Sequence, residues 1–250
     1  MMKFLIQKID GEIRHDFSFA LLESIRFKNW LTRNNKKEEI KVKYISTPEL
    51  FEPDDIYPSI MFKSIHNSYV PVGSVEFVTA FLQKFYDLTP KPRNVPEELF
   101  EYAGRGIYNG TEKDFPKYKK FFVKSNSGIK KFAEIVEDGN TLKPDNYQFS
   151  EFINIDSEWR VFVYENKLVG LQNYAGEFTK FPNIWRIDDM IITYESAPIA
   201  YTLDVGVNDE GTFVIECHDF FSCGLYGFVD HAKLPSMFNK WFKEYLKKNL

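Results

Sequence analysis

Apolar residues recur at the spacing of an amphipathic helix in three segments of the chain. The first covers residues 16–30, and the second covers 74–86, with Ser74 placed to cap its N-terminus. The third covers 234–250, and we expect it to dock on a core, with a helix lying on a membrane surface as the alternative. The apolar positions are Phe17, Leu21, Leu22, Ile25 and Trp30 in the first helix, and Leu234, Met237, Phe238, Trp241, Phe242, Tyr245 and Leu246 in the last.

Short apolar or alternating runs predict strands. Two lie near the start of the chain, at 4–9 and 41–45, on either side of the first helix. Residues 97–102 give a weaker helical pattern, and from residue 120 onward the chain is rich in strand patterns. Together these elements predict an α/β (α+β) fold. The later strands are expected at 121–124, 147–153, 159–165, 168–174, 199–205 and 212–217.

A proline-rich segment separates the two parts of the pattern. Residues 89–96 hold three prolines in eight residues, a density that excludes regular helix and internal sheet. We therefore expect a domain boundary there, with an N-terminal α/β subdomain at 1–90 and a larger β-rich domain at 91–250.

The net charge and the aromatic content of the chain both bear on whether the protein binds nucleic acid. The 250 residues carry 32 Lys and Arg against 36 Asp and Glu, a net charge of −4, which argues against nucleic-acid binding by bulk electrostatics. Aromatic residues make up 17% of the chain. An aromatic-rich core explains them, and platforms that stack on bases are the alternative.

The sequence also bears on the cellular compartment. No apolar run approaches the roughly 20 residues of a membrane span, and Lys3, Lys8 and Asp10 interrupt the first ten residues, unlike a signal peptide. Cys217 and Cys223 are too few for a disulfide framework, so we expect reduced thiols in a cytoplasmic protein.

A predicted hairpin at 201–216 carries the most informative acidic residues. A three-residue loop at 209–211 would place Asp204 directly opposite Glu216. Facing carboxylates repel each other unless a cation lies between them. Such oxygen ligands suit Mg²⁺, which takes one or two carboxylates together with phosphate oxygens. Two solvated acids, or a shifted register that separates them, are the alternatives.

Residues just after this hairpin could extend a ligand set. His218 and Asp219 follow directly. His218 with Cys217 and Cys223 also suggests zinc, but the paired two-to-four-residue spacing of zinc sites is absent.

Two basic residues, Lys124 and Arg160, lie in sequence contexts that are typical of anion binding. Lys124 ends an apolar strand and precedes the small polar loop 125–128, whose backbone N–H groups could hold a phosphate with the ammonium. The P-loop and Gly-x-Gly-x-x-Gly patterns are absent, and an ordinary surface lysine is the alternative. Arg160 lies within a strand, where it needs an anionic ligand or a structural salt bridge.

Taken in order, these segments resemble the ATP-grasp superfamily, and most closely its R-two-K clade, which is common in phages and bacterial conflict loci. The resemblance covers about residues 70–228. It rests on VPVGSVEF at 70–77, PRNVP at 92–96, FVK at 122–124, SEFI at 150–153, EWRVF at 158–162, LD at 203–204 and VIECHDFFSCGLY at 214–226.

The resemblance implies an N-terminal pre-ATP-grasp subdomain and an ATP-grasp domain of two lobes that meet near residue 150. Lys124 would hold the α/β-phosphates of ATP, with Arg105 in place of an earlier phosphate-binding lysine. Glu158 would bind the ribose hydroxyls, and Arg160 would face the γ-phosphate or an acyl phosphate. The hinge beside adenine would be Glu151, Phe152 and Ile153.

The implied metal site departs from the family pattern at one position. Asp204 and Glu216 would hold Mg²⁺, but His218 stands where the family usually has Asn. An imidazole can bind a metal although Mg²⁺ prefers oxygen, so Mn²⁺ or impaired catalysis also fits.

The resemblance further implies an ATP-dependent carboxylate–amine ligase that works through an acyl-phosphate intermediate. It identifies neither the carboxylate nor the amine, and a peptide or protein is one class of substrate that fits. An ATP-grasp kinase and a catalytically silent nucleotide-binding or interaction module are the alternatives.

Overall fold

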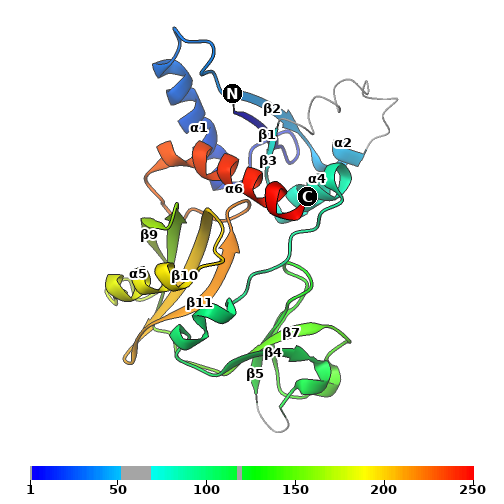
Figure 1. The fold of residues 1–250 in the computed structure, drawn as a ribbon, viewed down its shortest axis with the longest axis vertical. Coiled ribbons are helices and arrows are strands. Elements are labelled where there is room, and N and C mark those ends of the chain that lie inside the picture. The colour runs from blue at the N-terminus through cyan, green and yellow to red at the C-terminus, as the bar shows by residue number, and fades with distance from the viewer. Residues whose placement is uncertain (1, 52–68, 117–119) are drawn as a thin grey trace. The chain divides into compact units, whose positions relative to one another are not determined.

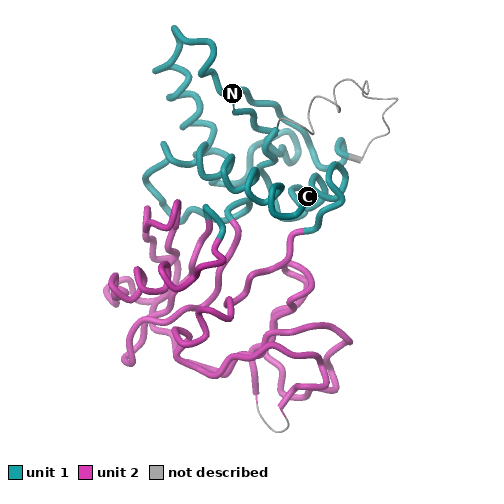
Figure 2. The backbone as a smooth tube through the Cα atoms, viewed as in Figure 1, with its two compact units in different colours: residues 1–89, 198–200, 220–250 teal, residues 90–197, 201–219 magenta. Residues whose placement is uncertain are grey.

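The chain folds into two compact units (Figures 1 and 2). The computed structural model describes residues 2–51, 69–116 and 120–250. Unit 1 comprises residues 1–89, 198–200 and 220–250, and unit 2 comprises residues 90–197 and 201–219. The C-terminal residues 220–250 therefore belong to the same compact unit as the N-terminal residues 1–89. The division into a 1–90 subdomain and a 91–250 ATP-grasp domain stays a prediction.

Unit 1 is built on a three-stranded parallel sheet in the order β2-β1-β3. Its central strand buries Phe4 and Ile6 on one face and Leu5 on the other, as expected for a parallel strand covered on both faces. Ser74 caps α4 by accepting a hydrogen bond from the Phe77 N–H at 3.2 Å, as predicted. The elements are β1 (Lys3–Gln7), α1 (Asp16–Leu31), β2 (Lys41–Ile45), α2 (Thr47–Phe51), β3 (Val70–Val72), α4 (Val75–Tyr86) and α6 (Leu234–Asn249).

The two long helices of unit 1 show where the predicted patterns hold. α6 buries the apolar residues among its first nine positions, and its expected docking on a core is confirmed. In α1 the predicted stripe is buried as far as Ile25, but Trp30 in the last turn is 57% exposed. No helix among the described residues is both long and apolar enough to span a membrane.

The first sheet of unit 2 has the order β11-β10-β8-β9. One face forms a core with α5 and the 3₁₀ helix η1, and this core takes Trp159, Val161 and Val163 from β8. Alternation along the strand leaves Arg160 and Phe162 on the other face, as predicted. The elements are β8 (Ser157–Tyr164), β9 (Lys167–Gly176), α5 (Ile184–Thr193), β10 (Ala200–Asn208), β11 (Gly211–Asp219) and η1 (Glu97–Tyr102).

The second sheet of unit 2 is antiparallel, in the order β4-β7-β5-β6. Its own small core includes Phe121 and Val123 from β5 and Tyr147 and Phe149 from β7. The strands are β4 (Ile107–Thr111), β5 (Phe121–Ser125), β6 (Ala133–Val136) and β7 (Asn146–Ser150).

Three features of unit 2 differ from the sequence prediction. The strand expected at 147–153 ends at Ser150, because the chain leaves the sheet as an irregular segment up to β8. The weak helix at 97–102 is a 3₁₀ helix that starts directly after Pro96. β4, β6 and α5 were not predicted. In α5 the chain buries only Ile187, Met190 and Ile191, and that stripe is short.

The β10–β11 hairpin turns over two residues, Asp209 and Glu210. Asn208 pairs with Gly211, whose φ of +124° lies in a region that favours glycine. The predicted three-residue loop is therefore one residue too long.

A β-bulge nevertheless produces the predicted pairing. The register shifts by one residue between Asp204 and Val205, which leaves Ile215 as the extra residue on β11. Asp204 consequently pairs with Glu216. Without the bulge, the shorter turn would set Asp204 opposite Ile215 and send Glu216 to the other face.

The aromatic core of unit 1 gives a stability prediction. Phe238 of α6 is fully buried, with ring centroids 6.3 Å from Phe17 and 4.8 Å from Phe220. Phe238→Ala should lower the free energy of unfolding by about 3–5 kcal/mol, because the cavity adds to the lost burial. Phe19→Ala, at a position 60% exposed, is the control and should cost about 0.5 kcal/mol or less. Urea unfolding followed by tryptophan fluorescence measures both losses of stability. Similar losses in the two variants would contradict the placement of Phe238 in the core of unit 1.

Candidate active site

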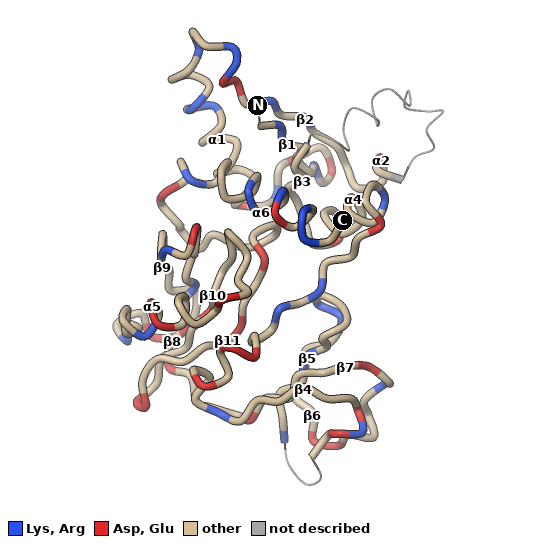
Figure 3. The backbone as a smooth tube through the Cα atoms, viewed as in Figure 1, with Lys and Arg blue, Asp and Glu red and all other residues tan. Residues whose placement is uncertain are grey.

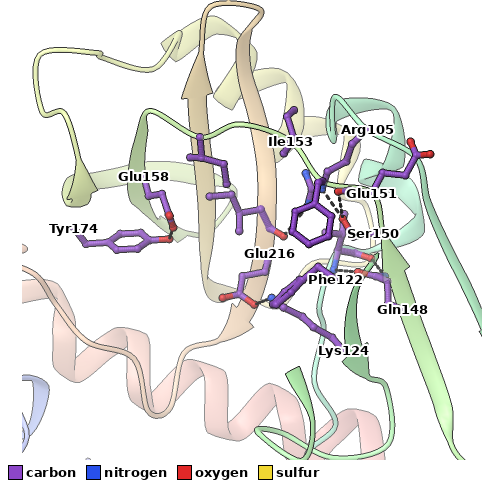
Figure 4. A pocket seen from close by; sticks show the side chains of 14 residues that line it. Arg105, Phe122, Lys124, Gln148, Ser150, Glu151, Ile153, Glu158, Tyr174 and Glu216 are labelled. Carbon is purple, nitrogen blue, oxygen red and sulfur yellow. Dashed lines mark hydrogen bonds and ion pairs between the residues drawn. The ribbon is translucent and has the colours of Figure 1, made fainter. Parts of the chain in front are cut away.

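A pocket of about 360 Å³ lies within unit 2, lined by residues of both its sheets (Figure 4). Strand alternation explains the lining: Phe121 and Val123 face the small core, so Lys124 faces the pocket. Six of the seven predicted nucleotide-binding residues line it, and Arg160 does not. They are Arg105, Lys124, Glu151, Phe152, Ile153 and Glu158. Their individual roles stay predictions.

Cations neutralise the facing carboxylates of the hairpin. Acidic residues mark β10 and β11 in Figure 3, and Asp204 and Glu216 are paired among them. Arg160 donates from Nε to Asp204 Oδ1 at 2.8 Å and from Nη2 to Oδ2 at 2.7 Å, and both side chains are buried. Lys124 donates to Glu216 Oε2 (Figure 4). Of the two alternatives for Arg160, the structure shows the salt bridge.

His218 joins the same cluster. Its Nε2 lies 3.0 Å from Glu216 Oε1 and 3.8 Å from Asp204 Oδ2. Burial alone would raise the pKa of Glu216, but the hydrogen bond from His218 and the charge of Lys124 outweigh burial. The pKa of Glu216 therefore lies well below its usual range, and the carboxylate stays ionised.

The cluster fits a divalent cation. One ligand atom each from Asp204, Glu216 and His218 lie within 4.8 Å of one another. Each carboxylate oxygen keeps lone pairs beyond those that its present partners use. One or two carboxylates are the usual protein share of a Mg²⁺ site, and the imidazole also suits Mn²⁺. The predicted metal ligands are thus brought together, with Lys124 and Arg160 beside them.

Arg105 reaches the pocket as a cation with neutral partners. Its Nε donates to Ser150 Oγ at 2.6 Å, and Nη1 donates to the carbonyls of Ala103 and Val214 at 2.8 Å each. Burial lowers its pKa to about 10, and among the described residues no carboxylate pairs with it. A guanidinium in this setting suits an anionic ligand.

The predicted hinge and ribose residues have defined partners. The Glu151 N–H donates to the Gly106 carbonyl at 2.9 Å, and Glu151 Oε2 accepts from the Gly106 N–H at 3.1 Å. Glu158 Oε2 accepts a hydrogen bond of 2.6 Å from the Tyr174 hydroxyl (Figure 4). Phe152 is 49% exposed, so an aromatic surface is present at the pocket rim.

Sequence reasoning missed several lining residues. Gln148 and Ser150 follow from alternation on the predicted strand, since Tyr147 and Phe149 are apolar. Tyr174 had no such signal. The β8–β9 register shifts between Glu158 and Trp159, which leaves Tyr174 as the extra residue of a bulge.

Asp145 organises the loop that follows Lys124. Its Oδ2 accepts hydrogen bonds from Ser125 Oγ at 3.0 Å and Ser127 Oγ at 2.9 Å, and Lys131 Nζ lies at 3.0 Å. Burial opposes ionisation, but these donors outweigh it and lower the pKa of Asp145 to about 2. The loop beside Lys124 is therefore held by an ionised carboxylate.

This pKa gives a prediction with a definite sign. The pKa of Asp145 is about 2 in the folded protein and about 3.9 in the unfolded chain, so the ionised carboxylate stabilises the fold above about pH 4. That contribution decreases as the pH falls toward 2. Asp145→Asn should lower the urea midpoint at pH 6, and the deficit should shrink at pH 3. Equal deficits at both pH values would contradict this account.

Comparisons with known proteins identify the family. Residues 102–234, just over half of the chain, match the model of the ATP-grasp domain of the R-two-K clade, family 2. A comparison with curated protein sequences finds no match.

Solved structures share the fold. D-alanine–D-alanine ligase from Bacillus anthracis is 13% identical, with a TM-score of 0.55 and 100% of both chains covered. D-cycloserine synthetase DcsG is 10% identical, with a TM-score of 0.58 over 98% of this chain and 99% of the other. N5-carboxyaminoimidazole synthetase from Staphylococcus aureus is 10% identical, with a TM-score of 0.55 over 94% and 77%. The expected fold class is confirmed, and the chain belongs to the ATP-grasp superfamily, in family 2 of the R-two-K clade.

Proposed function

We propose that the protein is an ATP-dependent carboxylate–amine ligase that forms an amide or peptide-type bond through an acyl phosphate. The observation that carries the proposal is the convergence of Lys124 with the facing carboxylates Asp204 and Glu216 beside the pocket. The family supports ATP as the nucleotide. The carboxylate and the amine are not identified, and a peptide or protein is one class of acceptor.

The pocket lining suggests how ATP would lie. Phe152 and Ile153 offer apolar surface for adenine, and Glu158, held by Tyr174, would accept hydrogen bonds from the ribose hydroxyls. Lys124 and Arg105 would bind the phosphates, because each brings a cation to the pocket wall.

Asp204, Glu216 and His218 would hold Mg²⁺ or Mn²⁺. The ion, when bound, would offset the charge of the phosphate oxygens. Lys124 and Arg160 lie against the same carboxylates, so the protein brings its own positive charge to this end of the pocket.

Catalysis of this reaction depends mainly on positioning the substrates and on neutralising the charge of the phosphate groups. A substrate carboxylate oxygen attacks the γ-phosphorus, the bond to the β,γ-bridging oxygen breaks, and ADP leaves. The amine then attacks the acyl carbon, phosphate leaves, and the amine nitrogen loses a proton. In this scheme Lys124 would stabilise charge on ATP, and Arg160 would stabilise the transferred phosphoryl group.

One observation favours a second candidate, a nucleotide-binding module without turnover. His218 Nε2 contacts Glu216 Oε1 at 3.0 Å, where an oxygen ligand from Asn is usual in the family. A silent module would bind ATP and consume none of it with any substrate mixture.

Nucleotide binding and turnover test the proposal. ATP at 100 times its dissociation constant stabilises a protein by about 2.7 kcal/mol, which is about 5–10 °C in Tm for a chain of this size. We expect a larger shift with Mg²⁺, and ADP release only with both a carboxylate and an amine from a panel of amino acids and dipeptides. Absence of any shift at millimolar ATP would refute the proposal, and binding without turnover would favour the silent module.

Glu216→Gln should remove the Mg²⁺-dependent part of the shift and abolish turnover, because the neutral amide is a poorer metal ligand. Glu210→Gln, in the exposed turn of the same hairpin, is the matched control and should behave like the wild type. Turnover by the Glu216→Gln variant at the wild-type rate would contradict the metal assignment.

Lys124→Met should weaken ATP and ADP binding by at least about 10-fold, since a charge-assisted contact contributes about 1.5–3 kcal/mol. Adenosine binding should change little, because adenosine has no phosphate. Lys167→Met, at an exposed strand end, is the control. Isothermal titration calorimetry measures all three ligands, and equal losses for adenosine and ATP would remove Lys124 from the phosphate subsite.

A further inference from the structure

Asn94 is a buried polar residue in the proline-rich segment of unit 2, and it does not line the pocket. It is 6% exposed and has a φ of +47°, in the left-handed region that Asn tolerates better than most residues. The backbone conformation explains a Gly, Asn or Asp at this position. The choice among these three depends on the side chain.

Asn94 connects β5, which carries Lys124, to β11, which carries Glu216. The Asn94 carbonyl accepts a hydrogen bond of 2.7 Å from the N–H of Cys217, the residue after Glu216. Its side-chain Nδ2 donates to the carbonyl of Ser125, the residue after Lys124, at 3.1 Å. Nδ2 also donates to Asn126 Oδ1 at 2.6 Å.

The residues on both sides of Asn94 are fixed as well. Arg93 Nε lies 3.0 Å from Asp219 Oδ1, and Arg93 Nη1 donates to the Tyr194 hydroxyl at 3.0 Å. Val95 exchanges two hydrogen bonds with the Gln148 side chain, at 2.9 and 2.8 Å. Residues 93–95 therefore contact β11 through Asn94 and Arg93, and they contact β7 through Val95. Asn94 lies between these two sets of contacts.

The side-chain amide is the part that only Asn supplies. Both of its contacts accept hydrogen bonds, so the position requires a donor. Gly would fit the backbone but leave the Ser125 carbonyl and Asn126 without this donor. Asp would set a carboxylate oxygen against the Ser125 carbonyl, and two acceptors repel each other.

We propose that Asn94 is a positioning residue that fixes the spacing between Lys124 with its loop and Glu216. This inference rests on the proposed function, in which Lys124 binds phosphate and Glu216 binds the metal. Asn94 itself lines neither the pocket nor the Asp204, Glu216 and His218 cluster. Its loss should let the Lys124 loop shift relative to β11, so ligands that need both strands should lose affinity, whereas the adenosine part should not.

The experiment compares Asn94→Gly and Asn94→Asp with the wild type for adenosine, ADP and ATP with Mg²⁺, by isothermal titration calorimetry. We expect Mg²⁺–ATP affinity to fall at least 10-fold in both variants, with ADP intermediate and adenosine within about twofold of the wild type. Asn166→Gly is the matched control, because Asn166 has a φ of +56° and lies in an exposed turn. It should leave all three affinities unchanged.

Each other outcome overturns a specific statement. Unchanged Mg²⁺–ATP affinity in both Asn94 variants, or equal losses for adenosine and Mg²⁺–ATP, would overturn the positioning role. Loss of the folded state in both variants under conditions where Asn166→Gly stays folded would assign Asn94 a structural role only. Failure of the wild type to bind ATP would overturn the proposed function and this inference with it.

Discussion

Two carboxylates that face each other on one side of a hairpin must be neutralised, and the polar face of the first sheet of unit 2 is arranged around that requirement. Asp204 takes a bidentate partner from Arg160 on β8, and Glu216 takes Lys124 from the other sheet. Each cation therefore comes from a different element. The cluster holds separate strands together and at the same time sets up a surface of mixed charge that suits a phosphate and a divalent ion side by side.

The Arg160–Asp204 pair is buried, whereas the Lys124–Glu216 pair keeps some contact with solvent. Loss of one partner of a buried pair leaves an uncompensated charge and is strongly destabilising. A pair in contact with solvent exchanges partners at lower cost, because water replaces what is lost. The Arg160–Asp204 pair is thus the costlier of the two to break, and each pair involves one carboxylate of the hairpin.

Much of this arrangement could be predicted from the sequence, because alternation and spacing are local properties. The face of Arg160 follows from a period of two. The facing of Asp204 and Glu216 was predicted from the length assumed for the turn. The turn was predicted one residue too long, and the pairing still held because a bulge at Ile215 compensates. Bulges carry no clear sequence signal, and the same reason hides Tyr174. Pairing across sheets, such as Lys124 with Glu216, depends on tertiary packing that no local pattern encodes.

The order of segments along the chain also matters for how the protein is made. Unit 1 takes residues from both ends of the sequence, and unit 2 lies almost entirely between them. Because domains form as the chain emerges from the ribosome, unit 2 can complete its contacts before α6 has been synthesised. During that interval Phe17 of α1 lacks the ring of Phe238 that packs against it in the finished protein. The side of α1 that packs against Phe238 therefore stays uncovered by α6 until the last part of the chain has been synthesised.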